Sequence, residues 1–400
     1  MDNLPTDYDL NEVLQRYSLA VIYHALTEAG ASTNLSGWLD TERHECEWGT
    51  SIICGDSGLS SRKVIALNMR QHSLKGTIPD EIRLLDRLES LQISENAIYG
   101  NIPAALGMLS NLHQLEMERN SFTGDIPTAI GALTSLKQLD LSHNFFTSTL
   151  PDELFQLKKL QYIDVSFNRL VGYFSNKFAA LSFLSTIDIR MNEFTGTFPE
   201  NLNQLSELAR LNVDFNQLSG SFPQTFDFMA KLEELTVSNN LLTGSISNET
   251  SPEFQNQAVE NFLAGKWMLK KLDISNNFFS GVVPNLIEML PNMIHIEIKG
   301  NMLEGPLPTL SSSSVEHIGA ANNYLTGTIQ TNFADSLQYL DYSGNKVSGS
   351  IPSELATLRW LANLDFSRNK LLNGTLPTEL GELRSIQYLA LGNCSLTGTL

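Results

Sequence analysis

The sequence predicts an α/β repeat solenoid, and three observations lead to this prediction. One pattern, L-x-x-L-x-L-x-x-N-x-L-x-G-x-I-P, recurs at steps of 22 to 25 residues on both sides of a single insertion. Apolar and polar residues alternate at period two before the asparagine of each repeat, and glycine and proline follow it. A fixed period of this length is typical of stacked coils that share one elongated core.

The asparagine of each repeat, here called the ladder residue, is expected to turn inward. Its amide would bond backbone groups that the bending chain leaves unpaired, because buried polar groups are costly when unsatisfied. Cys394 stands in the last of these positions in place of asparagine. The ladder residues are His72, Asn96, Asn120, Asn144, Asn168, Asn192, Asn216, Asn240, Asn277, Asn301, Asn323, Asn345, Asn369 and Cys394.

The segments around each ladder residue predict a strand, a bend and a short helical turn. Leu91 and Ile93 alternate with polar residues, which indicates a short strand with one buried face in a parallel sheet. Gly100 suits a tight bend, and the proline at 103 favours an extended segment. The stretch 104–112 then fits a short helix or 3₁₀ turn on the convex side.

The L-x-G-x-I-P segment after the ladder residue resembles the plant-specific class of leucine-rich repeats. This class occurs in receptor-like kinases, receptor-like proteins and secreted polygalacturonase inhibitors. The resemblance covers residues 64–400 and implies a right-handed superhelix of about fourteen repeats with a parallel concave sheet. An insertion near 247–265 interrupts the repeats, and the last repeat is truncated at Leu400.

Residues 1–63 are expected to form an N-terminal tail and a helical cap. The first coil of a solenoid exposes an apolar face that an atypical unit must cover. Trp38, Cys46, Trp48 and Cys54 resemble the cap of the same family, and this resemblance implies a disulfide between the two cysteines. The stretch 15–23 is most similar to the cap helix of algal receptor-like proteins.

Charge and motifs restrict the possible functions. The chain has 26 Lys and Arg against 44 Asp and Glu, and the net charge of -18 disfavours nucleic acid and anionic lipid as partners. No apolar run is long enough to insert into a membrane. The seven histidines are scattered and offer no cluster, so we expect no metal, no cofactor and no catalytic site. Kinase activity would lie outside this chain, because kinase motifs are missing.

The concave face is the expected ligand surface. We place on it the residues four, two and one positions before each ladder residue, and the first of these columns is acidic. This column would favour a basic ligand, or it would only keep the strand surface soluble. Its members are Glu116, Asp140, Asp164, Asp188, Asp273, Glu297, Asp341 and Asp365.

Three apolar residues directly before ladder asparagines form the predicted binding hot spot. Phe167, Met191 and Phe215 occupy this place in successive repeats, where other repeats have polar, charged or glycine residues. The alternative is that they pack on one another. Phe145 and Phe278, just after their ladder residues, are expected in the interior. The rim of the hot spot would consist of Tyr162, Arg190, Glu193 and Asp214.

The family resemblance implies a non-catalytic recognition domain at the cell surface or outside the cell, attached through a segment beyond this chain. Its expected partners are a protein, peptide or glycan ligand and a co-receptor. The alternatives are a secreted inhibitor of a wall-degrading enzyme and an intracellular scaffold, the latter because the segment 1–8 is no signal peptide. Four glycosylation sequons start at Asn34, Asn248, Asn373 and Asn393.

Overall fold

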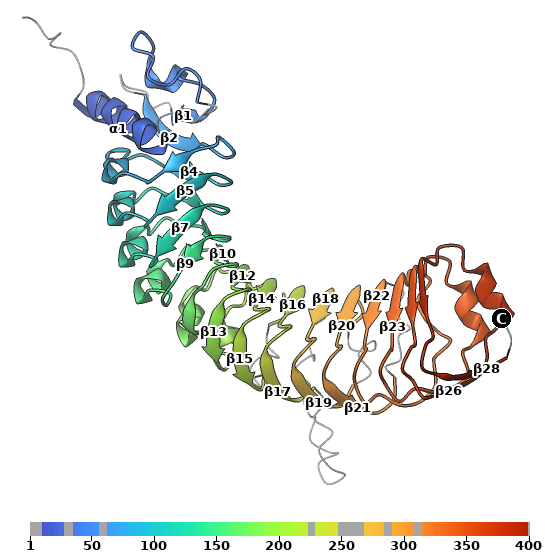
Figure 1. Ribbon diagram of the computed structural model, residues 1–400. Helices are drawn as coiled ribbons and strands as arrows, with labels where there is room; N and C mark the ends of the chain where they lie inside the picture. The colour runs from blue at the N-terminus through green and yellow to red at the C-terminus, as the bar shows by residue number, and fades with distance from the viewer. Residues whose placement is uncertain are drawn as a thin grey trace, which may run out of the picture. The chain divides into compact units, whose positions relative to one another are not determined.

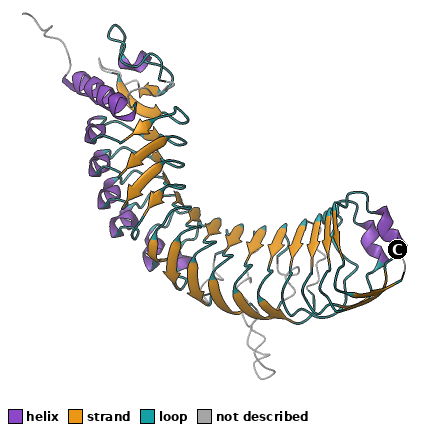
Figure 2. Ribbon diagram, viewed as in Figure 1, coloured by secondary structure: helices purple, strands orange, loops and turns teal. Residues whose placement is uncertain are grey.

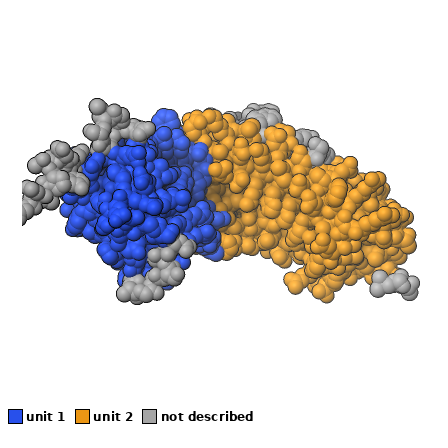
Figure 3. Space-filling model, turned by 90° about the horizontal axis from the view of Figure 1, so that it is seen from above, with its two compact units in different colours: residues 1–173, 177–194 blue, residues 174–176, 195–400 orange. Residues whose placement is uncertain are grey.

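The structure is a computed structural model that describes residues 10–27, 35–55, 62–222, 229–246, 268–283, 290–307 and 314–398. It has two compact units (Figure 3): residues 1–173 with 177–194, and residues 174–176 with 195–400. The predicted insertion at 247–265, the sequons at Asn34 and Asn248, and the truncated end at 399–400 lie outside the described residues.

The first unit contains a main sheet of one short strand per repeat (Figures 1 and 2). Its strands are parallel and in register from β2 onward, whereas β1 pairs with β2 in the antiparallel direction. The predicted parallel repeat sheet is therefore confirmed. The strands are β1 (Ile52–Gly55), β2 (Lys63–Asn68), β4 (Ser90–Gln92), β6 (Gln114–Glu116), β8 (Gln138–Asp140), β10 (Tyr162–Asp164) and β12 (Thr186–Asp188).

After each ladder residue of the first unit the chain forms a second strand and then a 3₁₀ helix. Pro79, Pro103, Pro127 and Pro151 precede the 3₁₀ helices with extended backbones, as predicted. The second strands are β3 (Lys75–Gly76), β5 (Ala97–Gly100), β7 (Ser121–Gly124), β9 (Phe145–Phe146), β11 (Val171–Tyr173) and β13 (Glu193–Gly196), in which the second unit begins. The 3₁₀ helices are η2 (Asp80–Leu84), η3 (Ala104–Met108), η4 (Thr128–Ala132), η5 (Asp152–Gln156) and η6 (Asn176–Ala180).

A helix, α1 (Leu10–Leu26), and the short η1 (Glu45–Glu47) form the cap at the start of the first unit. The helix buries Leu19 and Ile22 and anchors itself through Gln15, whose side chain accepts from the Val64 N–H at 2.8 Å. Cys46 and Cys54 form the expected disulfide, with 5.8 Å between the Cα atoms. No helix of the described residues is long and apolar enough to cross a bilayer.

The second unit repeats the same arrangement. Among its described residues the pairings within the main sheet are parallel, and the 3₁₀ helices are η7 (Leu202–Gln204), η10 (Ser353–Thr357) and η11 (Thr378–Glu382). The main-sheet strands are β14 (Arg210–Asn212), β16 (Glu234–Thr236), β18 (Lys271–Asp273), β20 (His295–Glu297), β22 (His317–Gly319), β23 (Tyr339–Asp341), β25 (Asn363–Asp365) and β27 (Tyr388–Ala390). The second strands are β15 (Gln217–Gly220), β17 (Leu241–Ser245), β19 (Phe278–Val282), β21 (Met302–Glu304), β24 (Ser348–Gly349), β26 (Leu371–Thr375) and β28 (Ser395–Thr397).

The core of each unit is a set of stacked apolar rows. In the first unit Leu115 is fully buried, and the rings of Phe122 and Phe146 stack with centroids 6.2 Å apart. The prediction that Phe145 and Phe278 lie in the interior is wrong, since they are 45% and 47% exposed. The residue directly after them points inward instead, because neighbouring residues of a strand face opposite sides.

The ladder asparagines hold the coils together as predicted. Asn144, which is 5% exposed, accepts from the Phe122 N–H in the preceding coil at 3.0 Å. Its Nδ2 donates to the carbonyls of Met117, Leu141 and Ser142 at 3.0, 3.2 and 3.1 Å. One amide thus satisfies backbone groups of two successive coils.

Candidate functional site

The main-sheet surface of each unit consists of the first and third residues of its three-residue strands, because the middle residue faces the core. The third residues form the acidic column that the sequence predicts. The prediction that the position two before the ladder residue also faces outward is wrong where serine occupies it, since Ser142, Ser166 and Ser275 are buried. In the first-position column, by contrast, only Tyr162 was predicted as part of the ligand surface.

The acidic column of the first unit closes local turns. At its three aspartates the backbone N–H two residues later donates to the carboxylate Oδ1 at 2.8 to 3.1 Å, whereas Glu116 accepts from the Gln114 and Gln138 side chains at 2.7 Å. Such side-chain to backbone bonds take the place of missing backbone pairs at the end of a strand. The acidic column therefore has a structural role as well as a charge. The pairs are Ser142 with Asp140, Ser166 with Asp164, and Arg190 with Asp188.

Burial raises the pKa of one carboxyl in this column, that of Asp140. Burial, with a smaller contribution from the neighbouring Asp164 carboxylate, raises the pKa of Asp140 to about 7. The two hydrogen bonds from Ser142 oppose this shift without cancelling it. Burial also raises the pKa of Tyr162, whose hydroxyl donates to Asp164 Oδ2 at 3.2 Å.

Two predicted hot-spot residues, Phe167 and Met191, lie in the first unit in left-handed backbone conformations, with φ of 52° and 53°. Two side chains contact the Phe167 ring: the His143 ring stacks 4.0 Å from it, and the Arg190 guanidinium lies 5.3 Å from its centroid. Met191 is 38% exposed. Arg190 also pairs with Asp188 at 3.3 Å, so this one residue of the predicted rim contacts both the Phe167 ring and the acidic column.

The third hot-spot residue, Phe215, belongs to the second unit and is 47% exposed, with φ of 52°. Its neighbour Asp214 accepts from the Ser238 N–H at 2.6 Å. Burial, followed by the charge of Asp273, raises the pKa of Asp214 to about 6. Three apolar side chains in a conformation that favours asparagine and glycine remain candidates for ligand contact.

An aromatic stack runs along the first-position column of the second unit. The rings of His295 and His317 lie 3.9 Å apart, and those of His317 and Tyr339 lie 4.1 Å apart, on three neighbouring strands. The prediction that the histidines form no cluster is therefore wrong for His295 and His317. Their sequence separation of 22 residues, one repeat, is the signal that would have revealed them.

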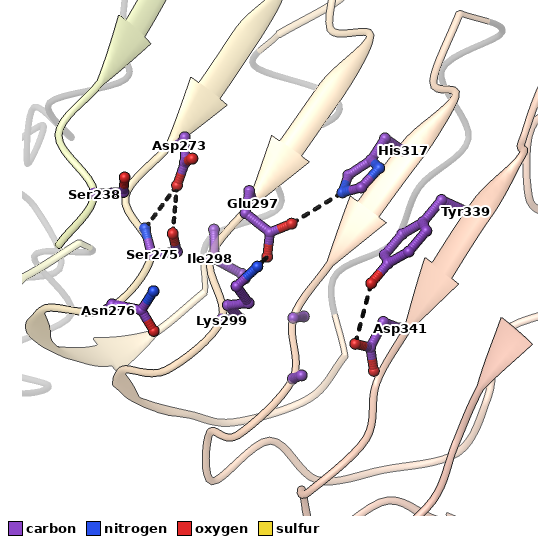
Figure 4. Close-up of polar contacts among 12 residues, drawn as sticks. Ser238, Asp273, Ser275, Asn276, Glu297, Ile298, Lys299, His317, Tyr339 and Asp341 are labelled. Carbon is purple, nitrogen blue, oxygen red and sulfur yellow. Dashed lines mark hydrogen bonds and ion pairs between the residues drawn. The ribbon is translucent and has the colours of Figure 1, made fainter. Parts of the chain in front are cut away.

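Glu297 lies two residues after His295 and bonds His317 (Figure 4). Glu297 Oε2 accepts from His317 Nε2 at 2.9 Å, and Lys299 Nζ lies 3.7 Å from Oε1. Burial alone would raise the pKa of Glu297, but the His317 bond and the Lys299 charge outweigh it and keep the pKa below its usual value. Burial and the neighbouring His317 lower the pKa of His295 to about 4, so this imidazole is neutral.

A shallow hollow of about 330 Å³ lies next to this stack on the main-sheet surface. Tyr339 and Tyr388 flank it, and Asp341, Asn363 and Asp365 supply polar atoms. The Tyr339 hydroxyl donates to Asp341 Oδ2 at 3.3 Å (Figure 4). The hollow thus combines two aromatic rings with two carboxylates.

The two sequons within the described residues lie outside the lining of the hollow. Asn373 is exposed on β26, and Asn393 is exposed next to the Cys394 ladder position. Cys394 substitutes for asparagine with two weaker contacts, from Sγ to the Phe366 carbonyl at 3.2 Å and to the Gly392 carbonyl at 3.9 Å. Both sequons are therefore accessible for modification of their side chains.

Short parallel strands joined by inward asparagines define a leucine-rich-repeat fold. A family model described as a leucine-rich repeat region matches residues 106–305, and a second leucine-rich-repeat model matches residues 336–358. The chain belongs to the leucine-rich-repeat family, and its structure is similar to the ectodomains of plant membrane receptors. No curated protein sequence matches it significantly.

Several solved structures resemble the chain. The ectodomain of the Arabidopsis thaliana membrane receptor kinase GASSHO1/SCHENGEN3, solved with CASPARIAN STRIP INTEGRITY FACTOR 2, is 29% identical with a TM-score of 0.86 over 98% of this chain and 45% of that one. The PEPR1–AtPEP1 structure is 28% identical with a TM-score of 0.78, over 96% and 55%. The Arabidopsis HAESA ectodomain with an IDA peptide hormone is 25% identical with a TM-score of 0.78, over 97% and 66%. The chain spans about half to two thirds of these structures.

Proposed function

We propose that the chain is a non-catalytic recognition domain of a cell-surface receptor-like protein that binds a peptide or protein ligand. The hollow between Tyr339 and Tyr388 is the observation that carries this proposal. The similarity to ectodomains solved with peptide ligands supports it. A preorganised sheet surface favours binding, because little ordering entropy is lost when the ligand docks.

The hollow favours a basic side chain of the ligand. Asp341 and Asp365 are register partners on adjacent strands, and strand spacing holds their backbones about 4.8 Å apart. Each carboxylate accepts one backbone N–H through Oδ1 at 2.8 Å. Two neighbouring negative charges repel each other, and a guanidinium between them would remove this repulsion. The ring faces of Tyr339 and Tyr388 add cation–π attraction.

The test is binding of a short arginine-containing peptide and of its citrulline counterpart, which has the same shape without the charge. We expect Asp341→Asn combined with Asp365→Asn to weaken arginine-peptide binding about tenfold or more, as charge-assisted bonds are lost. The citrulline peptide should bind more weakly to the original chain. Calorimetry or biolayer interferometry at two salt concentrations would measure both effects.

A matched control carries the same change of charge elsewhere. Asp86 and Asp125 are exposed in the first unit and do not line the hollow, so their replacement by asparagine should leave the affinity unchanged. Equal binding of both peptides, or equal weakening by the control pair, would contradict the proposed role of the hollow. The overall acidity of the chain would then explain any attraction.

The cell-surface location is a separate part of the proposal. The Cys46–Cys54 disulfide is typical of an oxidising compartment, and Asn373 and Asn393 are exposed sequons. Mass spectrometry of the protein from its own cells should find this disulfide and glycans on at least one of the two asparagines. Free thiols together with unmodified asparagines would instead favour the intracellular scaffold.

A further inference from the structure

The second unit carries a group of metal-ligating side chains beside the hollow, and none of them lines it. His295 and Glu297 lie two residues apart on β20 and face the same side of the sheet. His317 is the register partner of His295 on β22, so the solenoid places its imidazole beside the other two side chains. One potential ligand atom from each residue lies within 4.8 Å of the others.

We propose that His295, Glu297 and His317 form a binding site for a divalent transition-metal ion such as Zn²⁺. Two imidazole nitrogens and one carboxylate oxygen are donors that Zn²⁺ binds readily, and three protein ligands leave a fourth position open. The open position faces the main-sheet surface, where water or a group of the ligand can complete the coordination.

An unsatisfied carboxylate oxygen supports the site. The Glu297 side chain is only 8% exposed, and Glu297 Oε1 is buried without a hydrogen bond. Lys299 Nζ lies 3.7 Å from this oxygen, which is a long ion pair and not a hydrogen bond. A buried carboxylate oxygen left without a hydrogen bond is costly, and a coordinated cation would satisfy it.

The neighbouring strand provides the space that Glu297 needs. Gly319 is the register partner of Glu297, and a Cβ at this position would collide with the Glu297 carboxylate. The missing side chain lets the carboxylate lean toward His317 across the sheet, as Figure 4 shows. The geometry of the site therefore depends on glycine at this one position.

Metal binding requires a limited rearrangement of the imidazoles. An ion lies in the plane of each imidazole that binds it, whereas the two rings are stacked 3.9 Å apart with an angle of 14° between them. Rotation of one ring about its Cβ–Cγ bond would direct both lone pairs to a shared point, and the His317 side chain is 23% exposed. His317 would move its Nε2 proton to Nδ1 when Nε2 binds, so a neutral imidazole releases no net proton.

The experiment is calorimetric titration of the full chain, free of any affinity tag, with zinc chloride in a non-coordinating buffer near neutral pH. We expect one Zn²⁺ per chain, and at least a tenfold loss of affinity in His317→Gln and in Glu297→Gln. The second variant keeps the size of the side chain, so it tests the site even where the first one destabilises the fold. His113→Gln, outside the group, is the matched control and should leave the affinity unchanged.

Two further measurements make the result specific. Lys299→Met removes the cation that competes for Glu297 Oε1, so this variant should bind Zn²⁺ more tightly than the original chain. Co²⁺ bound at the site should give visible d–d absorption that the Glu297→Gln variant lacks. Absence of a stoichiometric transition, or binding that persists unchanged in both His317→Gln and Glu297→Gln, would overturn the proposal.

Discussion

Replacing Asn144 with alanine tests the reasoning on which the whole solenoid depends. The Asn144 side chain is buried in the first unit and bonds backbone groups of two successive coils. Alanine keeps the backbone conformation but removes both the acceptor and the donor. We expect the variant to fold with the same strands and a lower free energy of unfolding.

The expected loss of unfolding free energy follows from the hydrogen bonds that each partner of Asn144 keeps in the variant. The Met117, Leu141 and Ser142 carbonyls keep other donors, namely the Asn120 amide, the Asn168 amide and a backbone N–H. The Phe122 N–H loses the Asn144 Oδ1 acceptor at 3.0 Å. A buried donor left without a partner costs about 1–3 kcal/mol, and the weakened carbonyl bonds and the small void add to this cost. The expected loss of stability is about 2–4 kcal/mol.

Urea unfolding monitored by circular dichroism measures the global change, and hydrogen exchange measures the local one. Exchange of the Phe122 amide should accelerate more than that of amides several coils away. Asn111→Ala is the matched control, because its Nδ2 makes one exposed bond to the Asp86 carbonyl at 2.9 Å. A loss below about 1 kcal/mol for Asn144→Ala, together with unchanged Phe122 protection, would refute the reasoning.

Three further predictions concern charge, the last described coil and the cap. The folded-state pKa of Asp140 is about 7, above the ordinary 3.8, so its contribution to stability is full below about pH 4 and is lost as the pH rises through 7. Asp140→Asn should therefore stabilise the folded protein by about 1 kcal/mol near pH 8 and by almost nothing near pH 4. Equal effects in urea unfolding at both pH values would contradict the raised pKa of Asp140. Cys394→Asn should restore a full ladder amide and slow thermolysin cleavage of the last described coil, whereas faster cleavage would show that the position does not accept asparagine. Gly76→Ala places a Cβ against the Ala25 carbonyl oxygen, at a residue whose φ is 138°. This change should lower the free energy of unfolding by about 2–4 kcal/mol and speed amide exchange in α1. An unchanged unfolding midpoint would argue against the close contact between the cap helix and Gly76.

The repeat pattern determined the fold of the described residues because its signals are local and periodic. The ladder asparagine, the strand before it and the proline that directly precedes η2, η3, η4, η5, η10 and η11 follow from spacing and residue type alone. The inward direction of Asn144 followed from the cost of unpaired backbone groups. The error at Phe145 was a register error of one residue, which turns a side chain to the opposite face.

The candidate site required the tertiary structure. The period of two puts the first residue of each main-sheet strand on the same face as the third, so the column of His295 and Tyr339 was readable in principle. The contact of Glu297 with His317 was not readable, because it depends on how side chains lean across neighbouring strands. Burial of Asp140 likewise comes from packing, and no residue type or spacing reveals it.

The sequence by itself thus determined the class of fold, the positions of the ladder residues and the acidic character of the sheet surface, since these depend on periodicity and composition. Only the tertiary structure decided which surface side chains meet and which carboxylates are buried. Stacking brings residues about one repeat apart, such as His295 and His317, to a ring separation of 3.9 Å. The chemistry of the surface arises from these lateral contacts between coils, for which a single repeat contains no signal.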